Sequence, residues 1–218
     1  VDDSDEKYRK ENGLPLKSVE RKSEIINLII SENTHISIEE LEQKYEENEK
    51  NFNYLWKNKF ITLTVKERIN SLLEISNTNI ESKKLEMLVN KLEGMELNYY
   101  PDIIKNISST LEVLSNNFKL GVISDTIYSP GKNLRKILNH YNIEKYFQTF
   151  IFSDEVGRSK PSDVVFQKAI DSLKVEPFEL IHIGDRETND IQGVQKFGGK
   201  GILCVAAIDR GSEDSEAD

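Results

Sequence analysis

Side chains suited to phosphoryl chemistry follow three separate apolar runs in this sequence. The hydroxyl of Ser124 ends the first run, the ammonium of Lys160 follows the second, and Asp185 with Asp190 follows the third. A hydroxyl can hold a phosphate oxygen, a lysine can neutralise its charge, and carboxylate oxygens are the ligands that Mg²⁺ prefers. The combination indicates a site for metal-assisted phosphoryl transfer, provided that the three runs end at one place.

Each of these residues also has an ordinary structural interpretation. Ser124, Asp125 and Thr126 can form a turn or cap a helix, and Lys160 before Pro161 can be a surface residue at a helix start. One of the two later carboxylates can cap the helix that follows it. The functional interpretation depends on the ordered combination, which is more specific than any single member.

Short strands alternating with helices are predicted to position these residues. Apolar runs predict strands near 119–124, 148–152, 180–184 and 200–205. Helices are predicted near 103–116, 131–141, 161–174 and 189–197. This alternation predicts right-handed crossovers and a parallel sheet, which binds ligands beyond the carboxyl ends of its strands. We therefore expect an α/β fold with the polar groups gathered at one edge of the sheet.

Residues 17–98 show a different pattern, with apolar side chains at helical spacing and little that indicates a strand. Capping-box patterns, at Ser37 with Glu40 and at Thr64 with Glu67, mark two helix starts. The apolar stripes are interpreted as the interior of a helical bundle. The predicted organisation is a linker at 1–16, a helical domain at 17–98, an α/β domain at 99–205 and a polar tail at 206–218.

Composition restricts the partners and the compartment. The net charge of −9 disfavours non-specific binding to nucleic acids or anionic membranes, and no apolar run is long enough for a membrane span. The single cysteine, Cys204, excludes an internal disulfide and suits a reducing compartment. We expect a cytoplasmic protein with neither a nucleic-acid nor a membrane partner, and the composition leaves its oligomeric state open.

The three motifs together resemble those of the haloacid dehalogenase superfamily, most of whose members are phosphatases. Ser124 matches the second motif of that family, Lys160 the third, and Gly184-Asp185 with Asp190 the fourth. The resemblance is strong over residues 99–205. It implies a Rossmann-like core of parallel strands with an inserted helical cap, to which residues 17–98 are similar in character.

The resemblance also implies a reaction. In it an aspartate attacks phosphorus, an aspartyl-phosphate forms and water hydrolyses it, with Mg²⁺ as cofactor and a small phosphorylated metabolite as substrate. Ser124, Asp125, Thr126 and Lys160 would bind the substrate. Ser124, Lys160 and the two carboxylates of the fourth motif would form the catalytic set, with Asp185 and Asp190 at the metal.

The chain departs from the family at the first motif, a buried strand that ends in Asp-x-Asp and supplies the nucleophile. Asp3 and Asp5 have the right mutual spacing, but no strand precedes them. We therefore expect the nucleophile upstream of Val1, and the 218-residue chain to be an inactive fragment. In the family the missing strand lies between the strands that end at Ser124 and Gly184, so a gap or a collapsed pairing is predicted there.

Two functions remain open on this evidence. One is a phosphatase of small phosphorylated metabolites, and the other is a non-catalytic binding or regulatory module that lacks the nucleophile. A dinucleotide-binding domain is disfavoured because no Gly-x-Gly-x-x-Gly follows a predicted strand. From the helical half, Tyr54, Trp56 and Arg68 are possible substrate contacts, although packing or surface roles are favoured for each.

Overall fold

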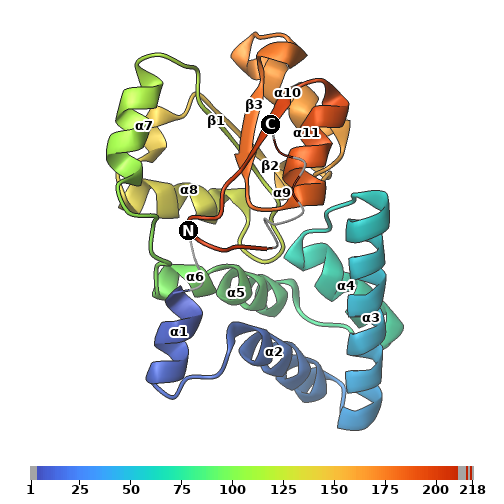
Figure 1. Cartoon of the computed structure of the whole chain (residues 1–218). Coiled ribbons are helices and arrows are strands. Elements are labelled where there is room, and N and C mark those ends of the chain that lie inside the picture. Colours follow the sequence, from blue (N-terminus) through green and yellow to red (C-terminus); the bar gives the residue numbers. More distant parts are fainter. Residues whose placement is uncertain (1–3, 211–214, 216, 218) are drawn as a thin grey trace.

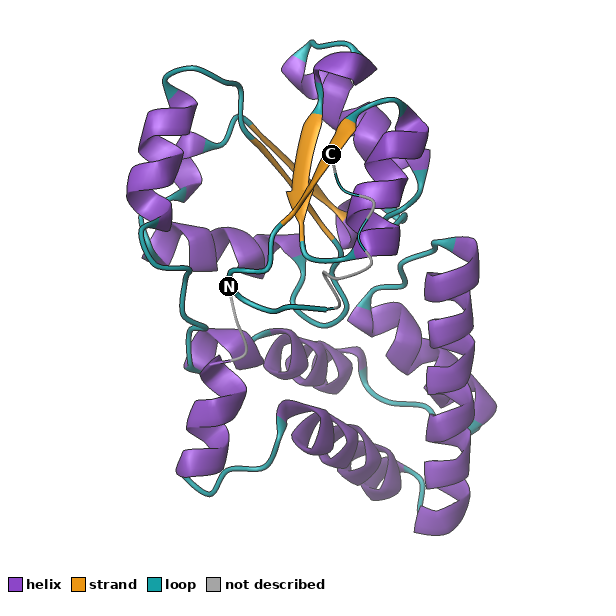
Figure 2. Cartoon of the chain, viewed as in Figure 1, coloured by secondary structure: helices purple, strands orange, loops and turns teal. Residues whose placement is uncertain are grey.

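The computed structural model describes residues 4–210, 215 and 217, and consists of a helical cap and an α/β core (Figure 1). Figure 2 shows all four strands in the upper half of the molecule and a lower half built from helices. This is the predicted fold class. None of the helices in the described part of the chain has the length and apolar character that crossing a membrane requires.

The cap is an assembly of helices around one apolar interior. The helices that precede the core are α1 (Ser4–Glu11), α2 (Lys17–Glu32), α3 (Ile38–Lys59), α4 (Val65–Ile75), α5 (Ser82–Glu93) and α6 (Met95–Asn98). The predicted apolar stripes meet in a buried cluster that includes Ile29, Leu41, Leu72 and Leu92. Burial of such side chains is the main source of stability for a helical bundle.

Side-chain caps define where two cap helices begin. At the start of α4, the Thr64 side chain accepts the Glu67 N–H at 3.2 Å and the Glu67 carboxylate accepts the Thr64 N–H at 2.7 Å. This is the complete capping box that the sequence predicts. At the start of α3, Ser37 accepts the Glu40 N–H at 3.1 Å, which is half of the same motif.

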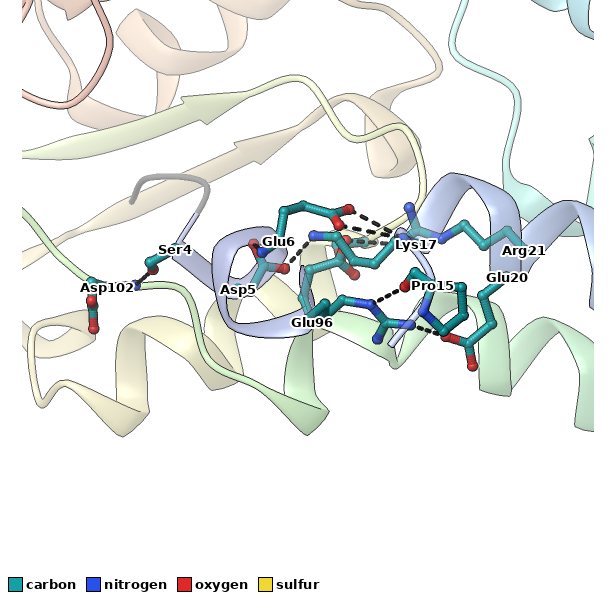
Figure 3. A network of polar contacts seen from close by, with 11 residues as sticks. Ser4, Asp5, Glu6, Pro15, Lys17, Glu20, Arg21, Glu96 and Asp102 are labelled. Carbon is teal, nitrogen blue, oxygen red and sulfur yellow. Dashed lines mark hydrogen bonds and ion pairs between the residues drawn. The ribbon is translucent and has the colours of Figure 1, made fainter. Parts of the chain in front are cut away.

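Helix α1 is attached to the cap by a network of charged side chains (Figure 3). The buried Asp5 carboxylate pairs with the Lys17 ammonium, which also lies 3.2 Å from Glu96, and the Glu6 carboxylate accepts the Lys17 N–H at 3.2 Å. Asp5 is therefore a structural ion-pair partner within the helical half. Asp3, the other residue with the spacing of the Asp-x-Asp motif, lies outside the described residues.

The core contains the predicted alternation of strands and helices. Its elements are α7 (Ile107–Ser115), β1 (Gly121–Ser124), α8 (Gly131–His140), η1 (Glu144–Tyr146), β2 (Thr149–Phe152), α9 (Ser153–Val156), α10 (Asp163–Leu173), η2 (Pro177–Glu179), β3 (Ile181–Gly184), η3 (Glu187–Ile191), α11 (Gln192–Phe197) and β4 (Lys200–Leu203). The last predicted helix starts differently from expectation, because the π-helical turn η3 precedes α11. Figure 1 shows α7 and α8 on one side of the strands and α10 and α11 on the other.

The strands form two separate parallel pairs. β1 pairs with β2, with Gly121 opposite Thr149, and β3 pairs with β4, with Ile181 opposite Lys200. Within the described residues no backbone ladder joins the two pairs. The interruption falls between the strands that end at Ser124 and Gly184, as predicted. One edge of β1 and one edge of β3 thus have no strand partner in the described part of the chain.

Strand β3 has one covered face and one open face. His182 is only 9% exposed, whereas its neighbours Ile181 and Ile183 are 52% and 55% exposed. Successive side chains of a strand point to opposite faces, so a single buried position between two exposed ones follows from the pleat. The buried face directs His182 toward Phe166 of α10, whose ring lies edge-on to the imidazole at 5.6 Å.

Backbone hydrogen bonds join the cap to the core beside Lys160. The Thr62 N–H donates to the Gly157 carbonyl at 3.3 Å, and the Ser159 N–H donates to the Phe60 carbonyl at 3.0 Å. These bonds form a short antiparallel bridge between the α3–α4 loop and the segment that leads into Lys160. The cap therefore has a fixed backbone attachment next to the candidate site.

A stack of side chains makes a second connection between cap and core. The Tyr128 ring, in the loop after β1, lies between the guanidinium groups of Arg21 and Arg68, at 4.1 and 4.3 Å from their central carbons. Arg68 also donates to the Ile127 carbonyl at 3.0 Å and to the Tyr128 hydroxyl at 2.8 Å. The stack links helices α2 and α4 to the loop that follows Ser124 and Asp125.

Candidate active site

Lys160 joins the ends of two strands that belong to different sheets. Its Nζ lies 2.6 Å from Asp190 Oδ1, beyond β3, and donates to the Ile123 carbonyl of β1 at 3.3 Å. Its backbone N–H donates to Asp125 Oδ1 at 2.9 Å. An ammonium has three N–H donors, so these two acceptors leave one for a ligand oxygen or a further carboxylate. The Lys160 side chain is 11% exposed, which weakens the competition from water.

Asp190 is the most deeply buried carboxylate of the site. It is 1% exposed, its Oδ1 lies 2.9 Å from His182 Nε2, and its Oδ2 accepts the Arg186 N–H at 2.9 Å. Burial by itself raises the pKa of Asp190, but the hydrogen bond from His182 and the charge of Lys160 outweigh it and lower that pKa well below its ordinary range. Asp190 is therefore a permanent anion that holds Lys160.

The absence of a side chain at Gly184 creates the space for Asp190. A Cβ at Gly184 would lie 2.3 Å from the Asp190 Cγ, which no folded structure tolerates without a shift. The fold therefore requires glycine at position 184, at the end of the strand, because a larger residue would collide with Asp190. The carboxylate packs directly against the backbone of the strand end.

Asp125 contacts Lys160 directly, and Ser124 precedes it as the last residue of β1. Burial raises the pKa of the Asp125 carboxyl above its ordinary value, although the charge and the backbone N–H of Lys160 act in the opposite direction. The Ser124 Oγ makes a contact of 3.4 Å with the Asp125 carbonyl, which is long for an O–H···O bond. The Ser124 hydroxyl is therefore suited to exchange this weak contact for a ligand oxygen.

Thr126 binds the first turn of α9. It is 4% exposed, its N–H donates to Ser153 Oγ at 2.8 Å, and its hydroxyl donates to Asp154 Oδ1 and accepts the Asp154 N–H, both at 2.8 Å. Because its donors and acceptor are engaged in binding α9, Thr126 holds the loop in place. Of the three residues predicted to bind substrate at the end of β1, Asp125 contacts Lys160 through its carboxylate.

The two predicted metal ligands differ in their availability. The Asp185 side chain is 38% exposed, and its Oδ2 accepts from Arg210 Nε at 2.5 Å. Asp190 is not an open ligand, because both of its oxygens are engaged by His182, Lys160 and the Arg186 N–H. Within the described residues no group of three or more ligating side chains surrounds a cation site. Asp185 alone fits Mg²⁺, which binds through one or two carboxylates and retains waters and phosphate oxygens.

The structure adds two residues that the sequence analysis did not assign. His182 contacts Asp190, and the Asn189 amide donates to the Lys160 carbonyl at 3.4 Å. A signal was present for the histidine, since it is the one polar side chain in an apolar strand run. Asn189 had no such signal, because it stands among other polar residues between Arg186 and Asp190.

The three cap residues considered as substrate contacts have different surroundings. Tyr54 is 53% exposed, and Arg68 is buried in the stack with Tyr128. The Trp56 ring centre lies 6.0 Å from the guanidinium of Arg186, which follows Asp185 in the chain. The indole N–H of Trp56 is buried and has no hydrogen-bond partner among the described residues.

Known proteins resemble this chain in sequence. The family model of the haloacid dehalogenase-like hydrolases matches residues 4–204. Over 99 residues the chain is 31% identical to a glyceraldehyde 3-phosphate phosphatase of Methanopyrus kandleri, an alignment that covers 45% of this chain and 40% of that protein. Over 107 residues it is 34% identical to a phosphoglycolate phosphatase of Aquifex aeolicus, with 49% and 46% covered. The matches thus span less than half the length of these relatives.

A solved structure shows the same fold over a larger part of the chain. A phosphatase of the haloacid dehalogenase type from Thermococcus onnurineus superposes with a TM-score of 0.55 at 19% identity, covering 90% of this chain and 84% of that one. At this identity the likeness concerns the fold alone. Since the family model extends over the cap and the core together, the chain belongs to the haloacid dehalogenase-like hydrolase family.

Proposed function

We propose that the complete protein is a Mg²⁺-dependent phosphatase of small phosphorylated metabolites. The observation that carries the proposal is the position of the Lys160 ammonium, held between Asp190 and the Ile123 carbonyl at the carboxyl ends of β3 and β1. Ligands of parallel α/β sheets bind at this end of the strands. The names of the two phosphatase relatives support the same reaction class.

In the proposed reaction each described residue has one task. The Ser124 hydroxyl and the Asp125 backbone N–H bind phosphoryl oxygens, and the free N–H of Lys160 neutralises the charge shared by nucleophile and phosphoryl group. Asp190 keeps that ammonium in place. Asp185 would hold Mg²⁺, which lowers the charge of the phosphoryl oxygens when bound.

The proposed nucleophile is an aspartate on a segment upstream of Val1. Its carboxylate attacks phosphorus, and the bond from phosphorus to the leaving oxygen breaks. The second aspartate of the Asp-x-Asp motif, in its protonated form, protonates that oxygen. Water then attacks the aspartyl-phosphate, which releases phosphate and restores the carboxylate. We place such a segment between β1 and β3, because each of these strands has a single strand partner in the described residues and the two pairs share no ladder.

The test is a phosphatase screen of the complete protein with Mg²⁺ on small phosphate monoesters. Lys160→Ala and Asp185→Asn are each expected to lower kcat by about 100-fold or more, because each removes a charge that the transition state requires. Matched controls are Lys168→Ala and Asp171→Asn, which change exposed residues of α10 and are expected to leave kcat unchanged.

Full activity in both site variants would contradict the proposal. Binding of inorganic phosphate that depends on Lys160, without turnover of any phosphate monoester, would instead support the alternative, a binding or regulatory module. An upstream segment without an Asp-x-Asp motif would point to the same alternative.

A further inference from the structure

A continuous series of hydrogen bonds runs from the buried face of β3 to the carboxyl end of β1. It starts at His182 Nε2, passes through Asp190 Oδ1 at 2.9 Å, continues to Lys160 Nζ at 2.6 Å and ends at the Ile123 carbonyl at 3.3 Å. The two strand pairs share no backbone ladder among the described residues, so these side chains are a polar link between them.

The direction of the first hydrogen bond follows from chemistry. A carboxylate oxygen only accepts hydrogen bonds, and Asp190 is ionised beside the Lys160 ammonium. His182 must therefore carry a hydrogen on Nε2, and this N–H donates a hydrogen bond to Asp190. One oxygen of Asp190 thus serves two donors, a ring N–H from β3 and the ammonium of Lys160.

The two donors differ greatly in mobility. Lys160 reaches Asp190 through a flexible four-carbon stem, whereas the His182 ring is fixed by its short link to a strand and by edge-on packing against Phe166 at an interplanar angle of 81°. Across the β3–β4 pair, His182 is opposite Gly201, where a Cβ would come within 2.9 Å of Ile191. The surroundings of the ring are therefore tightly packed.

We propose that His182 is a positioning residue that orients the Asp190 carboxylate and, through it, directs the Lys160 ammonium toward the phosphoryl group. Without the ring N–H, Asp190 keeps the Arg186 N–H on Oδ2 but loses its rigid donor on Oδ1. The carboxylate can then rotate, and Lys160 follows it away from the reacting atoms. This inference rests on the proposed phosphatase function.

The kinetic test compares two substitutions in the complete protein. His182→Leu keeps an apolar contact with Phe166 but removes the donor, and is expected to lower kcat by about 10- to 100-fold, as loss of an outer-shell partner typically does, with KM little changed. His182→Gln retains an N–H donor at a similar reach and is expected to recover most of that loss. His140→Leu, which removes an exposed histidine stacked on Tyr100, is the control with unchanged kcat.

A second measurement does not depend on activity. In nitrogen-15 spectra of the 218-residue chain, the Lys160 ammonium is expected to give a signal protected from exchange, assigned by its loss in Lys160→Met. That signal should disappear in His182→Leu and persist in His182→Gln.

The inference is overturned if His182→Leu retains wild-type kcat or leaves the ammonium signal unchanged. It is also overturned if Gln and Leu cause equal losses of kcat at equal melting temperatures, because the N–H donor would then be irrelevant. A wild-type protein inactive on all phosphate monoesters would contradict the proposed function instead. The spectroscopic comparison would still decide whether His182 positions Lys160.

Discussion

Asp190 illustrates how burial and bonded partners together set the charge of a single carboxyl group. Burial opposes ionisation, yet His182, Lys160 and the Arg186 N–H supply three donors to two oxygens. Removing one partner of such a buried pair costs more than the pair itself contributes, because the other charge is left without compensation. The residues around Asp190 are therefore expected to respond as a group to any single substitution.

The lowered pKa of Asp190 predicts how stability depends on pH. A carboxyl whose pKa is lower in the folded state contributes stability above its unfolded pKa, near the ordinary value of 3.8, and this contribution is lost as the pH falls toward the folded pKa. Asp190→Asn should be less stable at neutral pH and should lose less stability across that acidic window. Urea denaturation at a series of pH values measures both effects.

Two further variants serve as controls for this prediction. Asp171→Asn changes an exposed carboxylate and should leave the acidic slope unchanged. The pKa of Asp125 is raised in the folded protein. Its contribution to stability is therefore present below its unfolded pKa and is lost as the pH rises through its folded pKa. Asp125→Asn should therefore shift the acidic slope in the direction opposite to Asp190→Asn. An acidic slope unaffected by Asp190→Asn would show that this carboxyl is not ion-paired in solution.

The contact between Gly184 and Asp190 gives a second prediction for single residues. Gly184→Ala places a methyl group 2.3 Å from the Asp190 Cγ in the present geometry and should lower the free energy of unfolding by about 1–3 kcal/mol. In a double-mutant cycle with Asp190→Gly, which removes the Asp190 Cγ and also its Cβ at 2.6 Å, the cost of Ala at position 184 should decrease. Equal costs in both backgrounds would show that another contact determines the requirement for glycine.

At the scale of elements, the loop after β1 connects the site to the cap. It begins with Ser124 and Asp125 at the site, is fixed to α9 by Thr126, and then inserts Tyr128 between two arginines of α2 and α4. A cation over an aromatic face contributes about 0.5–2 kcal/mol, depending on its exposure. The stack is thus large enough to influence how the cap sits on the core.

Replacing Tyr128 should weaken this connection without unfolding the strands. In Tyr128→Leu, amide hydrogen exchange is expected to increase in α2 and α4, because both arginines lose the ring, while β1 and β2 remain protected. Tyr54→Leu, at a 53% exposed position of α3, is the matched control and should show no change. An increase confined to the loop itself would indicate that the backbone bridge at Thr62 is enough to hold the cap.

At the scale of the whole molecule, the core consists of two parallel strand pairs linked by side chains. Backbone groups at an unpaired strand edge lack hydrogen-bond partners, which is unfavourable inside a protein. We expect an upstream segment that carries the nucleophile to pair with β1 and β3 at once. Amide exchange of Val122, Ile123, His182 and Ile183 should then be slower in the complete protein than in the 218-residue chain.

The amides of α5 provide an internal reference for that comparison, because this helix belongs to the buried interior of the cap. Their exchange should be equal in both proteins. If β1 and β3 amides are protected equally with and without the upstream segment, the strands do not receive a partner from it, and the proposed location of the nucleophile is wrong.

Much of the architecture was predictable from local patterns. Apolar runs separated by helical segments predicted the four strands, and the capping box at Thr64 predicted the start of α4 within one residue. The ends of apolar runs identified Ser124, Lys160, Asp185 and Asp190 before any contact was known. These features depend on residue type and short spacing, and such information is present in the chain itself.

The pairing of those residues was decided by tertiary structure. The hydroxyl residues Ser124 and Thr126 lie two positions apart in the sequence, and only the structure shows that the Thr126 side chain binds Asp154 of α9. The same holds for the carboxylates: Asp190 is buried between His182 and Lys160, whereas Asp185 is exposed.

The sequence by itself determined the residue types of the site, their order and the strand ends that carry them. The tertiary structure alone decided which of them touch, because contact, burial and the resulting charge depend on distances between segments far apart in the chain. The link from His182 through Asp190 to Lys160 spans residues from β3 and from the segment before α10. Periodicity and spacing describe each of these segments separately, and only folding brings them within hydrogen-bond distance.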